Sequence, residues 1–197
     1  MTTWWDEVYT GDAPAPWDIG RPQRSLVRVA ERGLLSGQVL DAGCGTGEHA
    51  ILASRHGADS MGIDISPAAI AKAKAKAAKR GVTARFEVAD VLSLGELGIT
   101  FDTVVDSGLF HVFDDKDRAR YVTNLGLALR PGGVCYLMCF SDRQPGEFGP
   151  RRVRQDELRA AFSDGWTVES ITADTFEINP IGEATDAQAW LAVLIRR

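Results

Sequence analysis

The stretch that decides the fold is Val39-Leu40-Asp41-Ala42-Gly43-Cys44-Gly45-Thr46-Gly47-Glu48. It has the pattern of a short apolar strand, followed by three alternating glycines and the start of a helix. Glycines are needed at such a turn because the backbone must bend tightly and let a ligand approach without side chains in the way. The turn also points free backbone N–H groups at that ligand, which predicts a site suited to an anionic group.

One candidate ligand of this turn is a nicotinamide or flavin dinucleotide, whose fingerprint is Gly-x-Gly-x-x-Gly. The third glycine of that fingerprint would fall at position 48, which is Glu48. An acid at the start of the helix would repel the pyrophosphate that should lie there. The sequence therefore disfavours a dinucleotide-dependent oxidoreductase.

The segments on both sides of the turn alternate between strand and helix. Five strands are expected, over 38–41, 60–64, 84–89, 101–106 and 134–140. The intervening helices include one over 68–79, capped by Ser66, and one capped by Asp114 or Asp115. Such alternation with short connections predicts a doubly wound parallel sheet with right-handed crossovers.

Two further strands complete the predicted sheet, over about 166–173 and 188–195. No helix of useful length separates them, so we expect them to pair antiparallel at one edge. The predicted fold class is thus α/β, with a seven-stranded, mostly parallel sheet and one antiparallel edge strand. The 197 residues fit a single domain, 1–197, with an N-terminal helical cap over 1–35 and a core over 36–197.

Composition and charge exclude several kinds of partner. The chain has 22 basic and 27 acidic residues, and a net charge of −5 provides no general attraction for nucleic acid or an anionic membrane. Its start lacks the basic and apolar regions of a secretory signal, and no apolar stretch approaches the ~20 residues of a membrane-spanning helix. Three cysteines are too few and too scattered for a disulfide framework. We expect a cytoplasmic protein without nucleic-acid or membrane partners.

We also expect no metal site. Cys135 and Cys139 share one face of a predicted strand but would lie ~13 Å apart along it, too far to bind one ion. Cys44 lies within the glycine turn, and nothing in its surroundings marks it as a nucleophile.

Four motifs in order resemble the class I S-adenosylmethionine-dependent methyltransferases, over roughly residues 38–140. The first is Asp-x-Gly-x-Gly-x-Gly, and the others are Gly62-Ile63-Asp64-Ile65-Ser66, Phe86-Glu87-Val88-Ala89-Asp90-Val91 and Leu129-Arg130-Pro131-Gly132-Gly133-Val134. The resemblance implies a Rossmann-like fold with S-adenosylmethionine as the cofactor. The cofactor-binding residues that it implies at the glycine turn and the strand ends are Asp41, Gly43, Cys44, Gly45, Gly47, Asp64, Ile65, Asp90, Val91 and Asp106.

Within this family, each acid at a strand end is expected to have its own role. Asp64 would bind the ribose hydroxyls, Asp90 would accept a hydrogen bond from the adenine amino group, and Val91 would flank the ring. Asp64 follows Gly47 by 17 residues, which is consistent with one intervening helix.

The methyl acceptor is narrowed by motifs that the chain lacks. Enzymes acting on nucleobase amino groups usually carry Asn/Asp-Pro-Pro-Tyr after the fourth strand, where this chain has Asp106-Ser107-Gly108-Leu109. The paired glutamates of protein-arginine enzymes are also missing, and no basic channel is present for a nucleic-acid strand. We therefore expect a small-molecule acceptor, with sulfur or oxygen ahead of nitrogen.

The N-terminal segment favours the same conclusion. Its Trp4-Trp5-Asp6-Glu7-Val8-Tyr9 and Ala15-Pro16-Trp17-Asp18-Ile19-Gly20-Arg21-Pro22-Gln23 resemble the opening of thiopurine, thiol and halide methyltransferases and of related enzymes for phenolic or heterocyclic compounds. By that resemblance, Trp17 would cover the methionine end of the cofactor.

His111 follows the fourth strand on the ligand-bearing side of the predicted sheet. As a neutral imidazole it is the candidate base for taking a proton from a phenol or thiol, and the alternative is that it borders the pocket. The long loop over 141–152 would lie near the acceptor, and its arginines are expected to form a solvated, charge-balanced surface. A non-catalytic module that senses the cofactor or its demethylated product is the alternative function. The acceptor's identity and the oligomeric state stay open.

Overall fold

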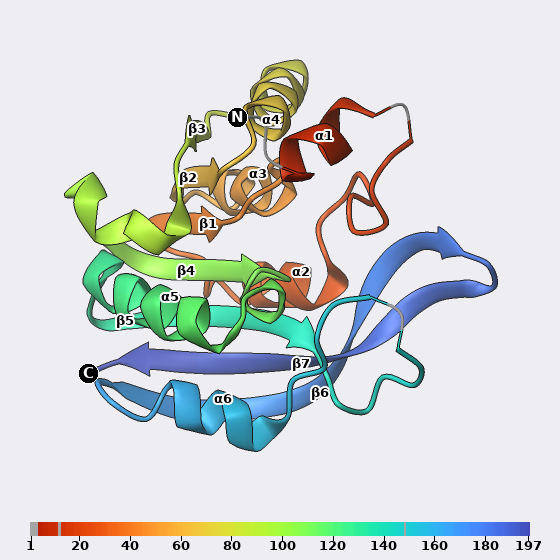
Figure 1. Ribbon diagram of the computed structural model, residues 1–197. Coiled ribbons are helices and arrows are strands. Elements are labelled where there is room, and N and C mark those ends of the chain that lie inside the picture. Colours follow the sequence, from red (N-terminus) through yellow and green to blue (C-terminus); the bar gives the residue numbers. More distant parts are fainter. Residues whose placement is uncertain (1–3, 12, 148) are drawn as a thin grey trace.

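The sheet of the computed structural model holds seven strands in the order β3-β2-β1-β4-β5-β7-β6 (Figure 1). The structure describes residues 4–11, 13–147 and 149–197. Strands β1 to β5 pair in parallel, and β7 runs antiparallel to both β5 and β6. The strands are β1 (Gln38–Ala42), β2 (Asp59–Asp64), β3 (Arg85–Val88), β4 (Phe101–Ser107), β5 (Leu129–Phe140), β6 (Trp166–Ile181) and β7 (Ala184–Arg196). The predicted mostly parallel sheet with an antiparallel pair at one edge is confirmed.

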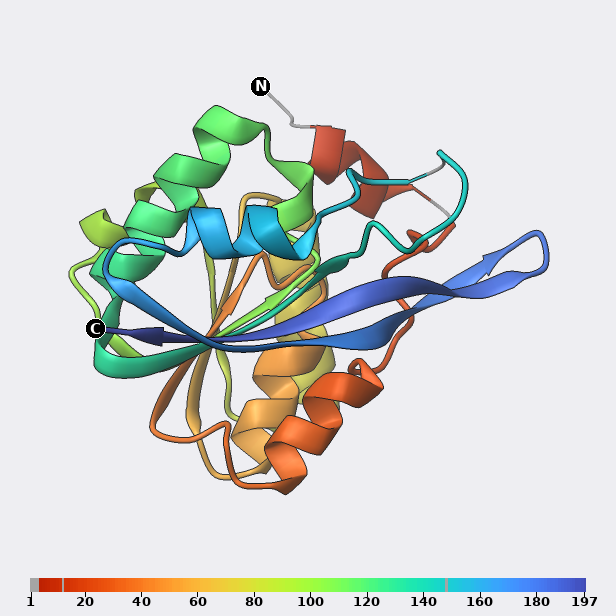
Figure 2. The same ribbon diagram turned by 90° about the horizontal axis from the view of Figure 1, so that it is seen from below.

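Helices cover both faces of this sheet, and Figure 2 shows the two helical layers in profile. Helices α2 and α3 pack on one face, and α5 and α6 pack on the other. The helices are α1 (Trp4–Thr10), α2 (Arg24–Glu31), α3 (Glu48–Arg55), α4 (Pro67–Lys79), α5 (Asp115–Ala128) and α6 (Gln155–Ala161), with short 3-10 turns η1 (Val91–Leu97) and η2 (Phe110–Val112). In the part of the chain that the structure describes, no helix is long and apolar enough to cross a membrane.

Local sequence explains the ends of the helices. The Ser66 hydroxyl accepts a hydrogen bond from the backbone N–H of Ala69 at 3.1 Å, and Pro67 takes the first turn of α4. Asp114 caps α5 in the same way by accepting from the N–H of Asp117 at 2.8 Å. The apolar run of β4 is buried on both faces, as expected of a central parallel strand.

The last two strands extend well beyond their predicted ends. Predicted as 166–173 and 188–195, they form a long hairpin that projects past the other strands in both views (Figures 1 and 2). The outer part of the hairpin contacts the N-terminal segment: the backbone N–H of Asn179 donates to the carbonyl of Pro16 at 2.7 Å. The sequence pattern did not indicate this extension, because polar residues such as Glu177 bind the distant N-terminal segment instead of packing in the core.

Candidate functional site

The glycine turn joins β1 to α3, and its three glycines all adopt left-handed backbone angles, with φ of 65° at Gly43, 50° at Gly45 and 84° at Gly47. Side chains also crowd each of them. A Cβ would lie 2.9 Å from Leu109 Cδ2 at Gly43, 2.6 Å from the Tyr9 hydroxyl at Gly45 and 2.6 Å from Phe86 Cε1 at Gly47. Glycine is therefore required here by both conformation and space.

Asp64, at the end of β2, is hydrogen-bonded to this turn. One carboxylate oxygen accepts from the backbone N–H of Gly45 at 2.8 Å, and the other accepts from the N–H of Ser66 at 2.9 Å. Burial raises the pKa of Asp64, and the backbone hydrogen bonds partly oppose that rise. The ends of β1 and β2 are thus joined through a single carboxylate that is 8% exposed.

The end of β3 lies beside the same acid, because the N–H of Ala89 donates to the carbonyl oxygen of Asp64 at 3.0 Å. This brings Asp90 to the site, where it is exposed and accepts from the N–H of Leu92 at 2.9 Å. Ile65, the residue after Asp64, is 41% exposed, whereas Val91 is buried in the core. The structure therefore gathers the ends of three neighbouring strands, as the motif order predicted.

Asp41 and Asp106 lie beneath this surface at 1% and 0% exposure. Asp41 accepts from the N–H of Ala50 at 3.0 Å, and Asp106 accepts from the N–H of Leu109 at 2.8 Å and the Tyr121 hydroxyl at 3.0 Å. Burial raises the pKa of each to about 7. Both carboxyl groups hold the backbone around the site, and their contact with a cofactor stays a prediction. Cys44 is likewise buried, against the core behind the turn.

The N-terminal segment crosses the site and contributes a residue that sequence reasoning missed, Tyr9. Its hydroxyl lies over Gly45 and accepts a hydrogen bond from the Trp17 indole N–H at 2.9 Å. Burial raises the pKa of Tyr9, so the phenol stays protonated. The signal in the sequence is the four-residue spacing of Trp5 and Tyr9, which places both on one side of α1. Trp17 therefore reaches the glycine turn through Tyr9.

Two polar clusters fasten this segment to the core. At one end, Asp6 accepts from the Ser66 hydroxyl at 2.7 Å and from the N–H of Ala68 at 2.9 Å. At the other end, the Thr46 hydroxyl donates to Asp18 at 2.7 Å. The guanidinium of Arg80 also donates to the carbonyl of Gly20 at 3.2 Å. The segment is therefore held on both sides of the glycine turn.

Glu48, the acid that disfavoured a dinucleotide, points toward α4. Lys76 Nζ lies 2.7 Å from one of its oxygens and Arg80 Nη1 lies 2.7 Å from the other. Burial raises the pKa of Glu48, but the hydrogen bonds from Arg80 and Lys76 outweigh it and leave the pKa lowered. The negative charge of Glu48 is therefore balanced by Lys76 and Arg80 within the protein.

His111 is buried next to the ends of β4 and β5, with 6% exposure. Its Nδ1 accepts from the backbone N–H of Phe140 at 2.8 Å, and it forms a further backbone hydrogen bond with Gly108. Burial, then the charges of Arg118 and Arg152, lower the pKa of His111 to about 3. The imidazole is therefore neutral and ties the end of β5 to the loop after β4.

Metal ligands do not gather in the described residues 4–11, 13–147 and 149–197, where no group of three or more His, Cys, Asp or Glu side chains could hold an ion. Cys135 and Cys139 are both fully buried on β5. Burial raises the pKa of each thiol, which keeps both sulfurs protonated.

The fold and the site together define a class. A doubly wound sheet, a glycine turn after β1 and an acid after β2 are the arrangement of class I S-adenosylmethionine-dependent methyltransferases. A family model described as "Methyltransferase domain" matches residues 39–133. The chain belongs to this methyltransferase family and is an enzyme that uses S-adenosylmethionine.

Several relatives show how far the similarity extends. The chain is 36% identical over 176 residues to 2-heptyl-1-hydroxyquinolin-4(1H)-one methyltransferase of Mycobacteroides abscessus, covering 85% of this chain and 78% of that protein. It is 26% identical over 179 residues to probable thiol methyltransferase 2 of Arabidopsis thaliana, covering 89% and 79%. A solved structure concerning the conversion of a disulfide bond into a thioacetal group during echinomycin biosynthesis superimposes with a TM-score of 0.88 at 40% identity, covering 100% of this chain and 93% of that one.

Proposed function

We propose that this enzyme moves a methyl group from S-adenosylmethionine to a thiol, hydroxyl or ring heteroatom of a small molecule by in-line displacement. The observation that carries the proposal is the hydrogen bond that the Gly45 N–H donates to the Asp64 carboxylate at 2.8 Å. It joins an acid to the glycine turn where the carboxyl ends of β1 and β2 meet. Acid and turn N–H groups on adjacent strand ends suit a ligand with ribose hydroxyls at one end and a charged amino acid at the other.

The residues around the turn fit such a cofactor. The turn itself is a cradle of glycines that a Cβ would fill. In this proposal Asp64 binds the ribose hydroxyls, Asp90 accepts a hydrogen bond from the adenine amino group and Val91 flanks the ring. Ile65 is a further cofactor contact, and Trp17 covers the methionine end. When bound, S-adenosylmethionine supplies an already activated methyl group on a sulfonium sulfur. The protein then has to align the acceptor with that methyl and exclude water.

The geometry supports a positioning role for His111 in place of the base role expected from sequence. Its ring nitrogens are engaged by the backbone of Phe140 and Gly108, and its pKa of about 3 makes it a weak proton acceptor. Without a base in this place, good acceptors are those that ionise near neutral pH, such as thiols and hydroxylated heteroaromatic rings. For such acceptors the rate should rise with pH according to the acceptor's own pKa.

The relatives favour a small acceptor and a catalytic protein. The Mycobacteroides relative is named for a hydroxyquinolone and the Arabidopsis relative for a thiol, and both names describe methyltransferases. The echinomycin-related structure concerns the conversion of a disulfide bond into a thioacetal group. These names support transfer to oxygen or sulfur and do not favour the non-catalytic sensor.

Calorimetry and a methyl-transfer screen test the proposal together. Asp64→Asn should weaken S-adenosylmethionine binding at least about tenfold, the equivalent of about 1.4 kcal/mol, whereas the control Asp59→Asn at the exposed start of β2 should bind as the wild type does. A labelled-methyl screen over thiols, phenols, hydroxyquinolines and halides should then find a product. Binding that is unaffected by Asp64→Asn would contradict the site, and binding without turnover would favour the sensor.

The role of His111 needs a separate measurement on the acceptor that the screen identifies. Under the positioning role, His111→Ala lowers the rate by a similar factor at every pH, because it loosens the end of β5 without removing a proton acceptor. Loss of a titration near neutral pH in the variant, with that titration present in the wild type, would restore the base role.

A further inference from the structure

A groove of about 870 Å³ runs between helices α5 and α6, which lie next to each other on one face of the sheet (Figures 1 and 2). The end of the groove near the first turns of the two helices is charged, with Arg118, Arg151 and Glu157 in its lining. In the part of the chain that the structure describes, none of the residues proposed for the cofactor lines this groove. It is therefore a feature separate from the candidate methyl-transfer site.

Arg118 of α5 lies at this charged end and reaches across to α6. Its side chain is 6% exposed, its Cζ lies 4.6 Å from the centre of the Phe110 ring, and its Nε donates to the Phe110 carbonyl at 3.2 Å. Its Nη1 lies 3.6 Å from Glu157 Oε1, too far for a hydrogen bond. Its Nη2 has no hydrogen-bond partner, and among the described residues it is the one buried side-chain nitrogen or oxygen of which this is true. Because a buried N–H without a partner costs free energy, the groove holds a donor that an added acceptor would satisfy.

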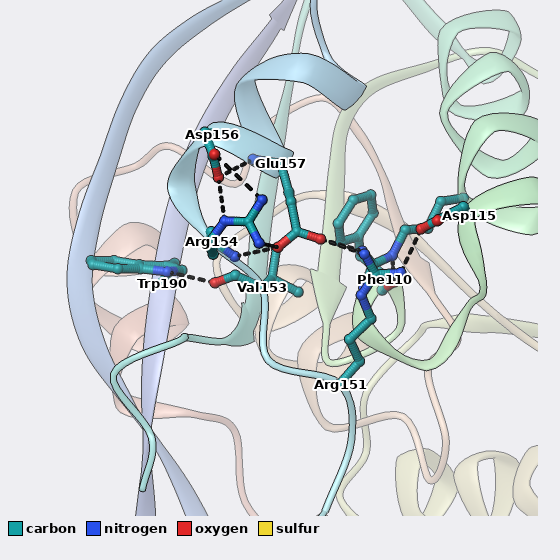
Figure 3. A network of polar contacts seen from close by, with 9 residues as sticks. Phe110, Asp115, Arg151, Val153, Arg154, Asp156, Glu157 and Trp190 are labelled. Carbon is teal, nitrogen blue, oxygen red and sulfur yellow. Dashed lines mark hydrogen bonds and ion pairs between the residues drawn. The ribbon is translucent and has the colours of Figure 1, made fainter.

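The carboxylates near Arg118 already bind other groups. One oxygen of Glu157 accepts from the backbone N–H of Arg154 at 2.9 Å, and the other pairs with the Arg151 guanidinium (Figure 3). Arg151 also pairs with Asp115, so this arginine is charge-balanced as the sequence predicts (Figure 3). Burial, and then the positive charge of Arg151, lower the pKa of Arg118. Arg118 is therefore a buried cation whose nearest carboxylate is shared with a second arginine.

Small and apolar residues line the groove beyond its charged end. Ala119 and Val122 come from α5, and Ala160 comes from α6. Leu127 also lines the groove, and it is 60% exposed. Arg196 lies there too, but its Nε and Nη1 donate to two backbone carbonyls at 3.0 and 2.8 Å. An apolar body lying along this wall would be removed from water, which favours its binding.

We propose that the groove between α5 and α6 is a binding site for a small carboxylate with an apolar body. The carboxylate accepts from the Arg118 guanidinium, whose planar fork suits two parallel hydrogen bonds, and the body lies along the apolar wall. Arg118 and Arg151 share Oε1 of Glu157, so the ligand completes the hydrogen bonding of Arg118 while Glu157 keeps Arg151. The ligand reaches Nη2 by an outward turn of the Arg151 side chain, which is 40% exposed.

Calorimetry with octanoate tests this site without any methyl transfer. We expect a Kd of about 1 mM or lower for the wild type, and binding at least about tenfold weaker for the uncharged octanamide. From butanoate through hexanoate to octanoate, the affinity should rise by up to about fourfold for each added methylene.

Two variants of α5 separate Arg118 from the general charge of the helix. Arg118→Met should weaken octanoate binding at least about tenfold. The matched control is Arg120→Met, because Arg120 Nη2 donates to the Ser93 hydroxyl at 3.3 Å and Arg120 does not line the groove. It should keep the Kd within about twofold of the wild type. Ala119→Leu leaves Arg118 in place and narrows the groove, so it should weaken octanoate binding more than about fivefold.

Several results would overturn the proposal. Octanoate that does not bind, or binds no better than octanamide, would show that the groove does not recognise a carboxylate. Equal affinities in the Arg118→Met and Arg120→Met variants would remove Arg118 from the site. Displacement of octanoate by S-adenosylmethionine would place it in the cofactor site instead of the groove. Thermal unfolding shows whether Arg118→Met is folded; if it is not, Ala119→Leu decides, and an unchanged affinity in that variant overturns the proposal.

Discussion

Gly47 offers a quantitative test of how the glycine turn is packed, through Gly47→Ala compared with Gly57→Ala. Both glycines have left-handed backbone angles, with φ of 84° and 89°. Their surroundings differ completely. A Cβ at Gly47 would lie 2.6 Å from Phe86 Cε1 and 2.9 Å from Ala73 Cβ, whereas a Cβ at Gly57 would meet nothing within 4 Å. The pair therefore separates backbone strain from steric overlap.

The expected magnitudes follow from these contacts. An alanine at Gly57 costs only the left-handed strain, about 1–2 kcal/mol. At Gly47 the overlap adds about 1–3 kcal/mol, because Phe86 is 4% exposed and cannot move aside. Phe86 also packs closely on Gly62, where a Cβ would lie 2.8 Å from the same ring. We therefore expect Gly47→Ala to be the less stable variant by about 1–3 kcal/mol.

Urea unfolding followed by circular dichroism measures both free energies, and thermal unfolding provides a second estimate. For a chain of this size each kcal/mol lowers the midpoint temperature by about 2–4 °C. The variants should show equal m-values, because neither changes the surface exposed on unfolding. If Gly47→Ala proved as stable as Gly57→Ala, the tight packing of the turn against Phe86 would be refuted.

Three further predictions concern the supports around the site. Ser66→Ala should lower the free energy of unfolding by about 1–2 kcal/mol in urea titrations, because α4 loses its cap, whereas the exposed Ser163→Ala should change it little. Asn179→Ala removes two side-chain hydrogen bonds to the carbonyls of Ala15 and Asp18, so limited proteolysis near residues 11–21 should accelerate while global stability changes little. Asp106 has a pKa of about 7 in the folded protein against 3.8 when unfolded, so its contribution to stability is lost as pH rises from about 4 to 7. Asp106→Asn should therefore gain stability relative to the wild type over that range, by up to about 4 kcal/mol. A difference in unfolding free energy between the two proteins that does not change with pH would contradict this.

Much of the fold could be predicted because its signals are local. The alternation of strand and helix, the Ser66 cap and the left-handed glycines each depend on residues close together in the chain. The hairpin extension could not be predicted in this way. It depends on pairs such as Gln23 with Glu177, whose side-chain and backbone hydrogen bonds at 2.9 Å join residues 154 positions apart.

The candidate site, too, could be predicted from the sequence only in part. Motif order predicted that Asp64 and Asp90 would lie at neighbouring strand ends, because parallel strands bring their carboxyl ends to one edge. It did not reveal that Asp106 is fully buried, or that His111 accepts a hydrogen bond from the Phe140 N–H. Burial and partners across the sheet are set by tertiary packing, which a position after a strand does not specify.

The buried acids bear on how the enzyme could tell its cofactor from the demethylated product. Asp41 and Asp106 lie at the ends of the adjacent strands β1 and β4, where Ala42 pairs with Asp106. Burial raises the pKa of both to about 7. As pH rises through 7 these two groups become carboxylates. The negative charge that the strand ends then gain, in surroundings of low dielectric constant, attracts the sulfonium cation of S-adenosylmethionine more strongly than the neutral thioether of S-adenosylhomocysteine.

The affinity for S-adenosylmethionine should therefore rise between pH 6 and 8 by about fivefold, the equivalent of ~1 kcal/mol, while that for S-adenosylhomocysteine stays nearly constant. Calorimetry of both ligands across this range measures the difference, and Asp106→Asn should reduce it because one titrating group is removed. By linkage, binding of the sulfonium cation must release protons at pH 7. The number of protons released follows from the binding enthalpy measured in buffers of different ionisation enthalpy. Parallel pH profiles for the two ligands would show that the buried acids hold the backbone and take no part in recognising the cofactor's charge.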